Sequence, residues 1–289
     1  MSFEKLQDRI NELRNPTVAG LDPTAALMPP ALIRGAEDTA ELYEKYCAAI
    51  IDAVCDVVPA VKPQSAFFET LGARGSETLF AVARYAKSRG LYVILDAKRG
   101  DIGSTASAYA EAYLSEDAPF DCITVNGYLG SDGIAPFFET ARRTDKSLFV
   151  LVKTSNPSSG EVQDLDAGGA KVYRRVADAA QLTARGETDK YGYTRVGFVA
   201  GATYPAELAE IRGAYPAAFL LVPGYGAQGG GAESVAAAFD ARGGGAVVNS
   251  SRAILGAWKK SGGDGARFAE DARREALAMR DALRAAANL

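Results

Sequence analysis

Histidine is absent from this chain of 289 residues. Its absence excludes Ser-His-Asp and Cys-His catalysis and every metal site that uses histidine ligands. Acid–base chemistry in this protein must therefore use Asp, Glu, Lys, Tyr or Cys side chains. A magnesium site built from carboxylates stays open, because that ion prefers oxygen ligands.

Cysteine is scarce, with Cys47, Cys55 and Cys122 only. We expect Cys47 and Cys55 on one helix, where a separation of eight residues corresponds to about 12 Å. That separation is too long for a disulfide bond. Three buried free thiols in a reducing cytoplasm are therefore the expected state.

The sequence also lacks an excess of positive charge and any long apolar run. A net charge of −4 argues against nucleic-acid binding, which needs a basic surface, but a few local cations could still hold a small anion. No apolar run approaches the roughly 18 residues of a transmembrane helix. Residues 2–14 predict a short amphipathic helix without the apolar centre of a signal peptide. We expect a cytoplasmic protein that binds neither nucleic acid nor membranes.

Short apolar runs bounded by Gly, Pro, Asp or Asn recur along the whole chain. Most are apolar on both faces, as in strands covered on both sides. The eight predicted strands are 17–22, 59–64, 91–98, 122–126, 148–153, 195–200, 219–224 and 246–251. The helical patterns between and after them are 41–57, 76–90, 104–115, 132–143, 168–185, 205–213, 232–241 and 265–286.

Eight alternating strand–helix units predict an α/β fold, a single-domain (β/α)8 TIM barrel over residues 1–289. A doubly wound open sheet is the alternative, but it needs a Gly-x-Gly-x-x-Gly turn after an early strand, which the sequence lacks. The longest insertion spans about 154–194, and its first part is predicted to be a polar loop. A second loop, PGYGAQGGG, covers 223–231, and we interpret the glycines at 243–245 as a turn at the opposite end of the barrel.

Polar residues gather at the carboxyl ends of the predicted strands, where barrels carry out their chemistry. They are Asp22, Lys62, Asp96, Lys98, Asp101, Asn126, Ser155, Gln228, Ser250, Ser251 and Arg252. Asp96 and Lys98 are two residues apart, so their side chains point to the same face of the strand. A buried pair of this kind needs further hydrogen bonds. The Asp96–Lys98 pair can be part of an active site, or it can be a salt bridge that closes the top of the barrel.

The glycine-rich loop at 223–231 has the composition of a phosphate-binding loop, with many backbone N–H groups and little side-chain bulk. Arg252, at the end of the next strand, can add a bidentate charge-assisted contact. The loops after strands seven and eight of a barrel often form a phosphate site. Linker glycines are the alternative interpretation.

These motifs together resemble the orotidine 5′-phosphate decarboxylase family, which makes UMP from OMP, and in particular its bacterial members with longer loops. The resemblance starts from an Asp-x-Lys-x-x-Asp signature, formed here by Asp96, Lys98 and Asp101. That signature alone is shared by a wider superfamily. The stretches that extend it over nearly the whole chain are GLDP, VKPQSAFFE, VNGYLGSDG, VKTSNP, PGYGAQGG and NSSRAI.

The resemblance implies roles for the residues that match its motifs. The implied catalytic residues are Lys62, Asp96, Lys98 and Asp101. Asp101 would come from the partner subunit of a homodimer, with Ile102 and Thr105 beside it. The resemblance also implies that Asp22, with Lys62, binds the ribose and that Ser155 contacts the pyrimidine. Gln228, Ser251 and Arg252 would bind the phosphate. Asn126 is a further implied substrate-binding residue. No metal and no organic cofactor is implied.

Two other functions would use part of the same set of residues. A Mg²⁺-dependent sugar-phosphate decarboxylase or aldolase of the same superfamily would share the signature. Those relatives use a carboxylate at the end of strand two, where this chain has Lys62, a cation that would repel the metal. A non-catalytic nucleotide-binding barrel would keep the glycine loop and Arg252 but would not need all four network residues.

Overall fold

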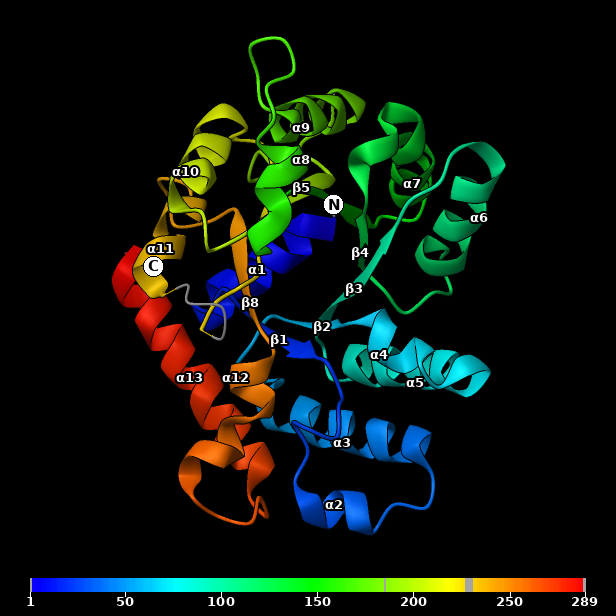
Figure 1. Cartoon of the computed structure of the whole chain (residues 1–289), viewed down its shortest axis with the longest axis vertical. Helices are drawn as coiled ribbons and strands as arrows, with labels where there is room; N and C mark the ends of the chain where they lie inside the picture. Colours follow the sequence, from blue (N-terminus) through cyan, green and yellow to red (C-terminus); the bar gives the residue numbers. More distant parts are fainter. Residues whose placement is uncertain (1, 185, 227–230, 288–289) are drawn as a thin grey trace.

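Eight parallel strands close into a barrel in the computed structural model (Figure 1). The structure describes residues 2–184, 186–226 and 231–287. The strands are β1 Thr17–Leu21, β2 Ala60–Pro63, β3 Tyr92–Arg99, β4 Cys122–Val125, β5 Ser147–Lys153, β6 Val196–Ala200, β7 Leu220–Val222 and β8 Ala246–Ser250. Each strand pairs with the next, and β8 returns to β1 with Asn249 opposite Val18. The predicted (β/α)8 barrel is therefore confirmed.

The helices surround the ring of strands. They are α2 Pro30–Arg34, α3 Thr39–Val54, α4 Ser65–Glu69, α5 Gly72–Ser88, α6 Gly103–Leu114, α7 Ser131–Arg143, α8 Gly160–Gln163, α9 Val172–Thr183, α10 Pro205–Ala214, α11 Ala232–Val235, α12 Arg252–Leu255 and α13 Phe268–Ala287. Short 3-10 helices are η1 Gly127–Leu129, η2 Pro157–Ser159, η3 Ala236–Ala238 and η4 Ala257–Ser261. The predicted helix at 232–241 appears as α11 followed directly by η3, and it ends at Ala238 because Phe239 is extended and the Asp240 carboxylate accepts hydrogen bonds from the Arg242 and Gly244 N–H groups.

The strands are buried on two sides, which explains their nearly continuous apolar sequences. In β3, Val93 and Leu95 face outward into the layer between the strands and the helices. Tyr92 and Ile94 face inward into a second cluster inside the barrel. The predicted alternation of this strand is confirmed, and Asp96 continues its inward face.

The helix α1, Ser2–Leu13, lies across one end of the barrel (Figure 1). Phe3 packs between Phe149 and Phe219, with ring centroids 4.8 and 4.9 Å apart. The Gln7 side chain accepts a hydrogen bond from the Gly245 N–H at 3.0 Å. The turn at 243–245 therefore lies at the closed end, and the polar strand ends lie at the other.

Helix α3 shows how local chemistry sets a boundary. The Asp38 carboxylate accepts hydrogen bonds from the N–H groups of Ala40 and Glu41, so the helix begins at Thr39 rather than at residue 41. It ends at Val54, so Cys55 caps the helix and is partly exposed. The expectation of three buried thiols is therefore wrong for Cys55, although all three cysteines are free.

The insertion at 154–194 has more regular structure than its polar start predicts. Its first part contains η2 and α8, and the predicted helix at 168–185 appears as the shorter α9. Pro157 begins η2, where its fixed φ suits a helical first turn. Within the described part of the chain, no helix is both long and apolar enough to cross a membrane.

Candidate active site

A pocket of about 450 Å³ opens at the carboxyl ends of the strands. Six of the predicted site residues line it. They are Asp22, Lys62, Asp96, Ser155, Ser251 and Arg252. They come from the ends of β1, β2, β3, β5 and β8 and the segments that follow, so only closure of the barrel brings them together.

The Asp96 carboxylate lies at the centre of the pocket's charged network and is only 7% exposed. One of its oxygens accepts hydrogen bonds from the Lys62 ammonium at 2.6 Å and the Gln64 amide at 2.9 Å. The other accepts from the Lys98 ammonium at 2.5 Å and the Thr124 hydroxyl at 3.0 Å. Four donors therefore satisfy the buried charge, as a buried ion pair requires.

The network stays charged at neutral pH. Burial raises the pKa of Asp96, but the Lys62 and Lys98 ammonium groups outweigh it and hold that pKa well below its usual range. Burial lowers the pKa of Lys62, but the carboxylates of Asp96 and Asp22 outweigh it, so the net shift is upward. The Asp96 carboxylate therefore lies between two ammonium groups, one of which, that of Lys62, lines the pocket with it.

Lys98 has a strained backbone. Its φ of +48° lies in the left-handed region, and the register between β3 and β4 shifts between Leu95 and Arg99. A non-glycine residue in this conformation costs about 1 kcal/mol or more. The Lys98 N–H donates to the Thr124 hydroxyl at 2.9 Å. Lys98 and Asp96 are joined by a hydrogen bond, although the backbone departs here from a regular strand.

Sequence reasoning missed Gln64 and Thr124, which complete the shell around Asp96. Both residues had a weak signal in the sequence. Gln64 follows Lys62 by two residues, so it has the same parity, and Thr124 is a polar residue inside the apolar run of β4. Their role depends on distances between strands, which the sequence does not contain.

Next to the network, the pocket has two acceptors with no partner. Within the described part of the chain, Oδ1 of Asp22 and Oδ1 of Asn249 are buried and make no hydrogen bond. Gly20 makes room here, because a Cβ on it would lie 1.9 Å from the Ser251 Oγ and 3.2 Å from Oδ1 of Asn249. Asn249 was not predicted, although it shares the inward parity of Ser251. Both acceptors suit ligand hydroxyl or N–H groups.

The lining of the pocket also includes described residues that were predicted to bind an anion. Gly224, with φ of +98°, and Tyr225 line the pocket together with Arg252. Among the described residues, no ion pair or hydrogen bond occupies the Arg252 guanidinium. Gln228 lies outside the described residues, so its predicted contact stays a prediction.

Besides Lys98, which is joined to the pocket residue Asp96 by a hydrogen bond, four predicted residues in the described part of the chain do not line this pocket. Ile102 is 55% exposed, and the Asp101 carboxylate accepts a hydrogen bond from the Ile102 N–H at 2.8 Å. Thr105 is exposed on α6. The side chain of Asn126 caps η1 by accepting from the Tyr128 N–H at 3.0 Å. In a single chain these residues lie beside the site rather than in it.

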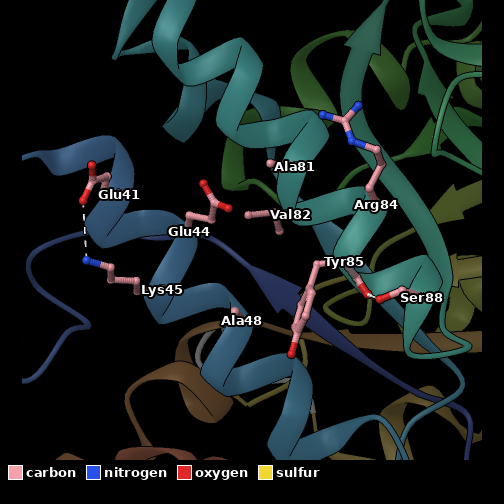
Figure 2. A pocket seen from close by; sticks show the side chains of 9 residues that line it. All are labelled: Glu41, Glu44, Lys45, Ala48, Ala81, Val82, Arg84, Tyr85 and Ser88. Atoms are coloured by element: carbon pink, nitrogen blue, oxygen red, sulfur yellow. Dashed lines mark hydrogen bonds and ion pairs between the residues drawn. The ribbon is translucent and has the colours of Figure 1, made fainter.

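A larger hollow of about 720 Å³ lies between α3 and α5 on the outside of the barrel (Figure 2). Its side chains include Glu41 and Lys45, which form an exposed ion pair, and Tyr85. None of the predicted site residues lines this groove. We therefore place the candidate site at the strand ends.

The described residues contain no group of three or more Cys, Asp or Glu side chains that could hold a metal ion. Asp96 already accepts four hydrogen bonds, two of them from ammonium groups. It is therefore a poor ligand for a divalent cation, which would meet two positive charges there.

A family model described as Orotidine 5′-phosphate decarboxylase / HUMPS family matches residues 17–261. The chain belongs to this family. A curated member from Rhodopirellula baltica, named orotidine 5′-phosphate decarboxylase, is 48% identical over 255 residues, covering 84% of each chain. A member of the same name from Clostridium perfringens is 38% identical over 287 residues, covering 99% of each chain.

Solved structures agree with this family membership. The structure of Leishmania donovani OMP decarboxylase has a TM-score of 0.73 and 33% identity, covering 97% of this chain and 99% of that chain. A crystal structure from Toxoplasma gondii has a TM-score of 0.83 and 32% identity, covering 99% and 98%. The family resemblance inferred from the motifs is therefore confirmed.

The charged network generates a prediction about stability. Replacing Asp96 by Ala removes the carboxylate that is hydrogen-bonded to the buried Lys62 ammonium and leaves only the more distant Asp22 carboxylate near it. We expect the free energy of unfolding at pH 7 to fall by about 3 kcal/mol, because an unpaired buried charge is costly. Urea denaturation measures this change. The control Asp117→Ala removes an exposed carboxylate away from the site and should stay within about 0.5 kcal/mol of the wild type.

The pH dependence of this difference has a definite sign. The pKa of Asp96 is depressed in the folded chain. Its contribution is therefore present above its unfolded pKa, about 3.9, and is lost as the pH falls through the folded value. The gap between wild type and Asp96→Ala should narrow below about pH 4. A gap that widens on acidification would contradict this account of the network.

Proposed function

We propose that this chain converts OMP to UMP and CO2 without a metal or organic cofactor, in pyrimidine nucleotide synthesis. The observation that carries the proposal is the Lys98 ammonium, held 2.5 Å from the buried carboxylate of Asp96, which lines a pocket together with Lys62 and Arg252. Support comes from relatives named orotidine 5′-phosphate decarboxylase at 38 and 48% identity.

Lys98 is the group that we assign to the reacting carbon. When the bond from C6 of the pyrimidine to the carboxylate breaks, CO2 leaves and the electron pair stays on C6 as a carbanion. A fixed ammonium stabilises this charge as it develops, which lowers the barrier. Lys98 then donates its proton to C6 to give UMP and takes a new proton from water.

Asp96 acts as the positioning residue for Lys98. Its carboxylate is held by Lys62, Gln64 and Thr124, so the ammonium needs little reorganisation when the substrate arrives. The backbone strain at Lys98 fits this role, because strain is kept where the surrounding contacts fix a functional side chain. Lys98 remains about half exposed and so is accessible to a ligand.

The rest of the pocket would bind the nucleotide. We assign Asp22 and Lys62 to ribose hydroxyls and Ser155 to the pyrimidine. The phosphate would be bound by Arg252, the Ser251 N–H, Gln228 and the N–H groups of the loop at 223–231. Binding energy at the phosphate, far from C6, can organise the loops around the reacting carbon. No contact supports a substrate role for Asn126, which stays a prediction.

We propose a homodimer in which Asp101 of each subunit completes the network of the other. A group of exposed apolar side chains, Ile102, Tyr109, Tyr128 and Leu129, supports an interface next to Asp101. A Cβ on Gly133 would lie 3.0 Å from the Leu129 Cβ and 3.3 Å from the Asp101 carbonyl oxygen, so these segments are adjacent.

The three free cysteines support a cytoplasmic location.

The proposed function is tested by the ultraviolet absorbance of OMP with purified protein and EDTA. We expect a rapid change toward the UMP spectrum. A flat trace that responds to Mg²⁺ and a sugar phosphate would indicate the metal-dependent alternative, and UMP binding without turnover would indicate a nucleotide-binding barrel. Either result would overturn the proposal.

Lys98→Ala tests the proton donor. We expect it to remove nearly all turnover, because both the stabilising charge and the proton are lost, while UMP still binds. Steady-state kinetics and calorimetric titration with UMP measure the two effects. Retention of more than about 5% of kcat would contradict the role of Lys98 as general acid.

Arg252→Ala tests the phosphate site. Loss of a charge-assisted bidentate contact should weaken OMP binding by about 2 kcal/mol, a factor of about 30. Turnover of orotidine, which lacks the phosphate, should hardly change. An equal loss with both substrates would place Arg252 outside the phosphate site.

Mixing two inactive variants tests the dimer. Lys98→Ala and Asp101→Ala each damage every site of their own homodimer. In hybrids, one of the two sites combines an intact Lys98 with an intact Asp101. After subunit exchange at equal concentrations, we expect about a quarter of the wild-type activity to return, because half of the dimers are hybrids. No return of activity, with exchange verified by mass spectrometry, would exclude the shared site.

A further inference from the structure

Lys153, the last residue of β5, is a buried cation outside the charged network. It is 1% exposed. Its ammonium donates to both carboxylate oxygens of Asp164 at 2.8 and 2.9 Å and to the Ser159 hydroxyl at 3.3 Å. The ammonium also lies 4.4 Å from the ring centroid of Tyr204. A charge this deeply buried is tolerated only when it is paired in this way.

The next residue along the chain makes a second, parallel connection. The Thr154 N–H donates to the Gln163 Oε1 at 2.9 Å, and the Gln163 amide donates back to the Thr154 hydroxyl at 2.7 Å. Lys153 and Thr154 are thus joined to Asp164 and Gln163. We name these four residues the β5 clamp. It closes residues 155–162 into a loop whose two ends are tied together.

Ser155 is the first residue inside that loop and is packed tightly from the side of β6. A Cβ on Gly201 would lie 2.9 Å from the Cα and Cβ of Ser155. The Thr203 hydroxyl donates to the Ser155 carbonyl at 3.3 Å, and the Gly201 N–H donates to the Lys153 carbonyl at 2.8 Å. With the clamp on one side and β6 on the other, the Ser155 backbone has little freedom.

We propose that Lys153, through the β5 clamp, is a positioning residue for Ser155 in substrate recognition. Ser155 lines the pocket and Lys153 does not, so any effect of Lys153 on the substrate must pass through the loop. The proposal rests on the proposed function, in which Ser155 contacts the pyrimidine. A displacement of about 1 Å in such a contact can reduce the rate about a hundredfold.

Lys146, at the opposite end of β5, provides a matched control. It is 8% exposed, and its ammonium donates to the carbonyl groups of Ser115 and Ala118. Burial lowers its pKa to about 8. Lys146 directly precedes β5 and Lys153 ends it, so replacing either lysine by Met removes a buried ammonium at one end of this strand, but only Lys153 is connected to the loop of Ser155.

The decisive experiment compares Lys153→Met and Lys146→Met in the full-length protein. We expect Lys153→Met to lower kcat/KM for OMP at least about tenfold and to weaken UMP binding, with Lys146→Met within about twofold on both. In a Ser155→Ala background, Lys153→Met should add little, because the residue through which it acts is already gone. Equal losses in the two lysine variants, or full additivity with Ser155→Ala, would overturn the proposal.

Two further measurements keep the test decisive if Lys153→Met folds poorly. Gln163→Ala breaks only the second connection of the clamp, at a partly exposed position, and should lower kcat/KM about threefold or more. Hydrogen exchange should rise at residues 155–162 in this variant and not in Lys146→Met. Unchanged kcat/KM with unchanged exchange would exclude the clamp.

These readouts separate the two proposals. A wild type that does not decarboxylate OMP would overturn the proposed function, whereas UMP affinity and hydrogen exchange still report on the clamp. An active wild type with identical Lys153→Met and Lys146→Met variants would overturn the clamp alone.

Discussion

The burial of one carboxylate between two ammonium groups is the constraint on which the site depends. Asp96 can stay charged inside the barrel only because donors arrive from β2, β3 and β4 together. That condition ties the chemistry to the closure of the sheet, since a shift of any of these strands would remove a donor. The same condition holds Lys98 in a strained conformation that an isolated strand would not adopt.

The two ends of the barrel have different roles. At one end, α1 and a cluster of Phe side chains fill the interior, so that end supplies packing energy. At the other, the inward positions change from apolar to polar along the same strands. In β3 the sequence passes from Tyr92 and Ile94 to Asp96 without a change of parity. Stability and chemistry are therefore arranged along one strand rather than in separate layers.

The sequence was sufficient for the barrel and for the charged residues at the strand ends, because apolar runs and strand parity are local signals. It was not sufficient for Gln64, Thr124 and Asn249, whose roles depend on distances between strands. It also placed Asn126 in the site, whereas the local geometry uses that side chain to cap η1. Asp101, Ile102 and Thr105 lie at the surface of the single chain, because the role expected of them depends on a second subunit and not on the fold of one chain.

The β5 clamp also bears on how such barrels diverge. The loop from 155 to 162 is tied at its ends by residues 153, 154, 163 and 164, and inside it Ser155 lines the pocket while the buried Ser159 binds the Lys153 ammonium. Sequence changes at the exposed positions 156–158, 161 and 162 can therefore accumulate without altering the register of β5. The loop is thus an exchangeable module, and a graft that moves it to another barrel must carry all four clamp residues with it.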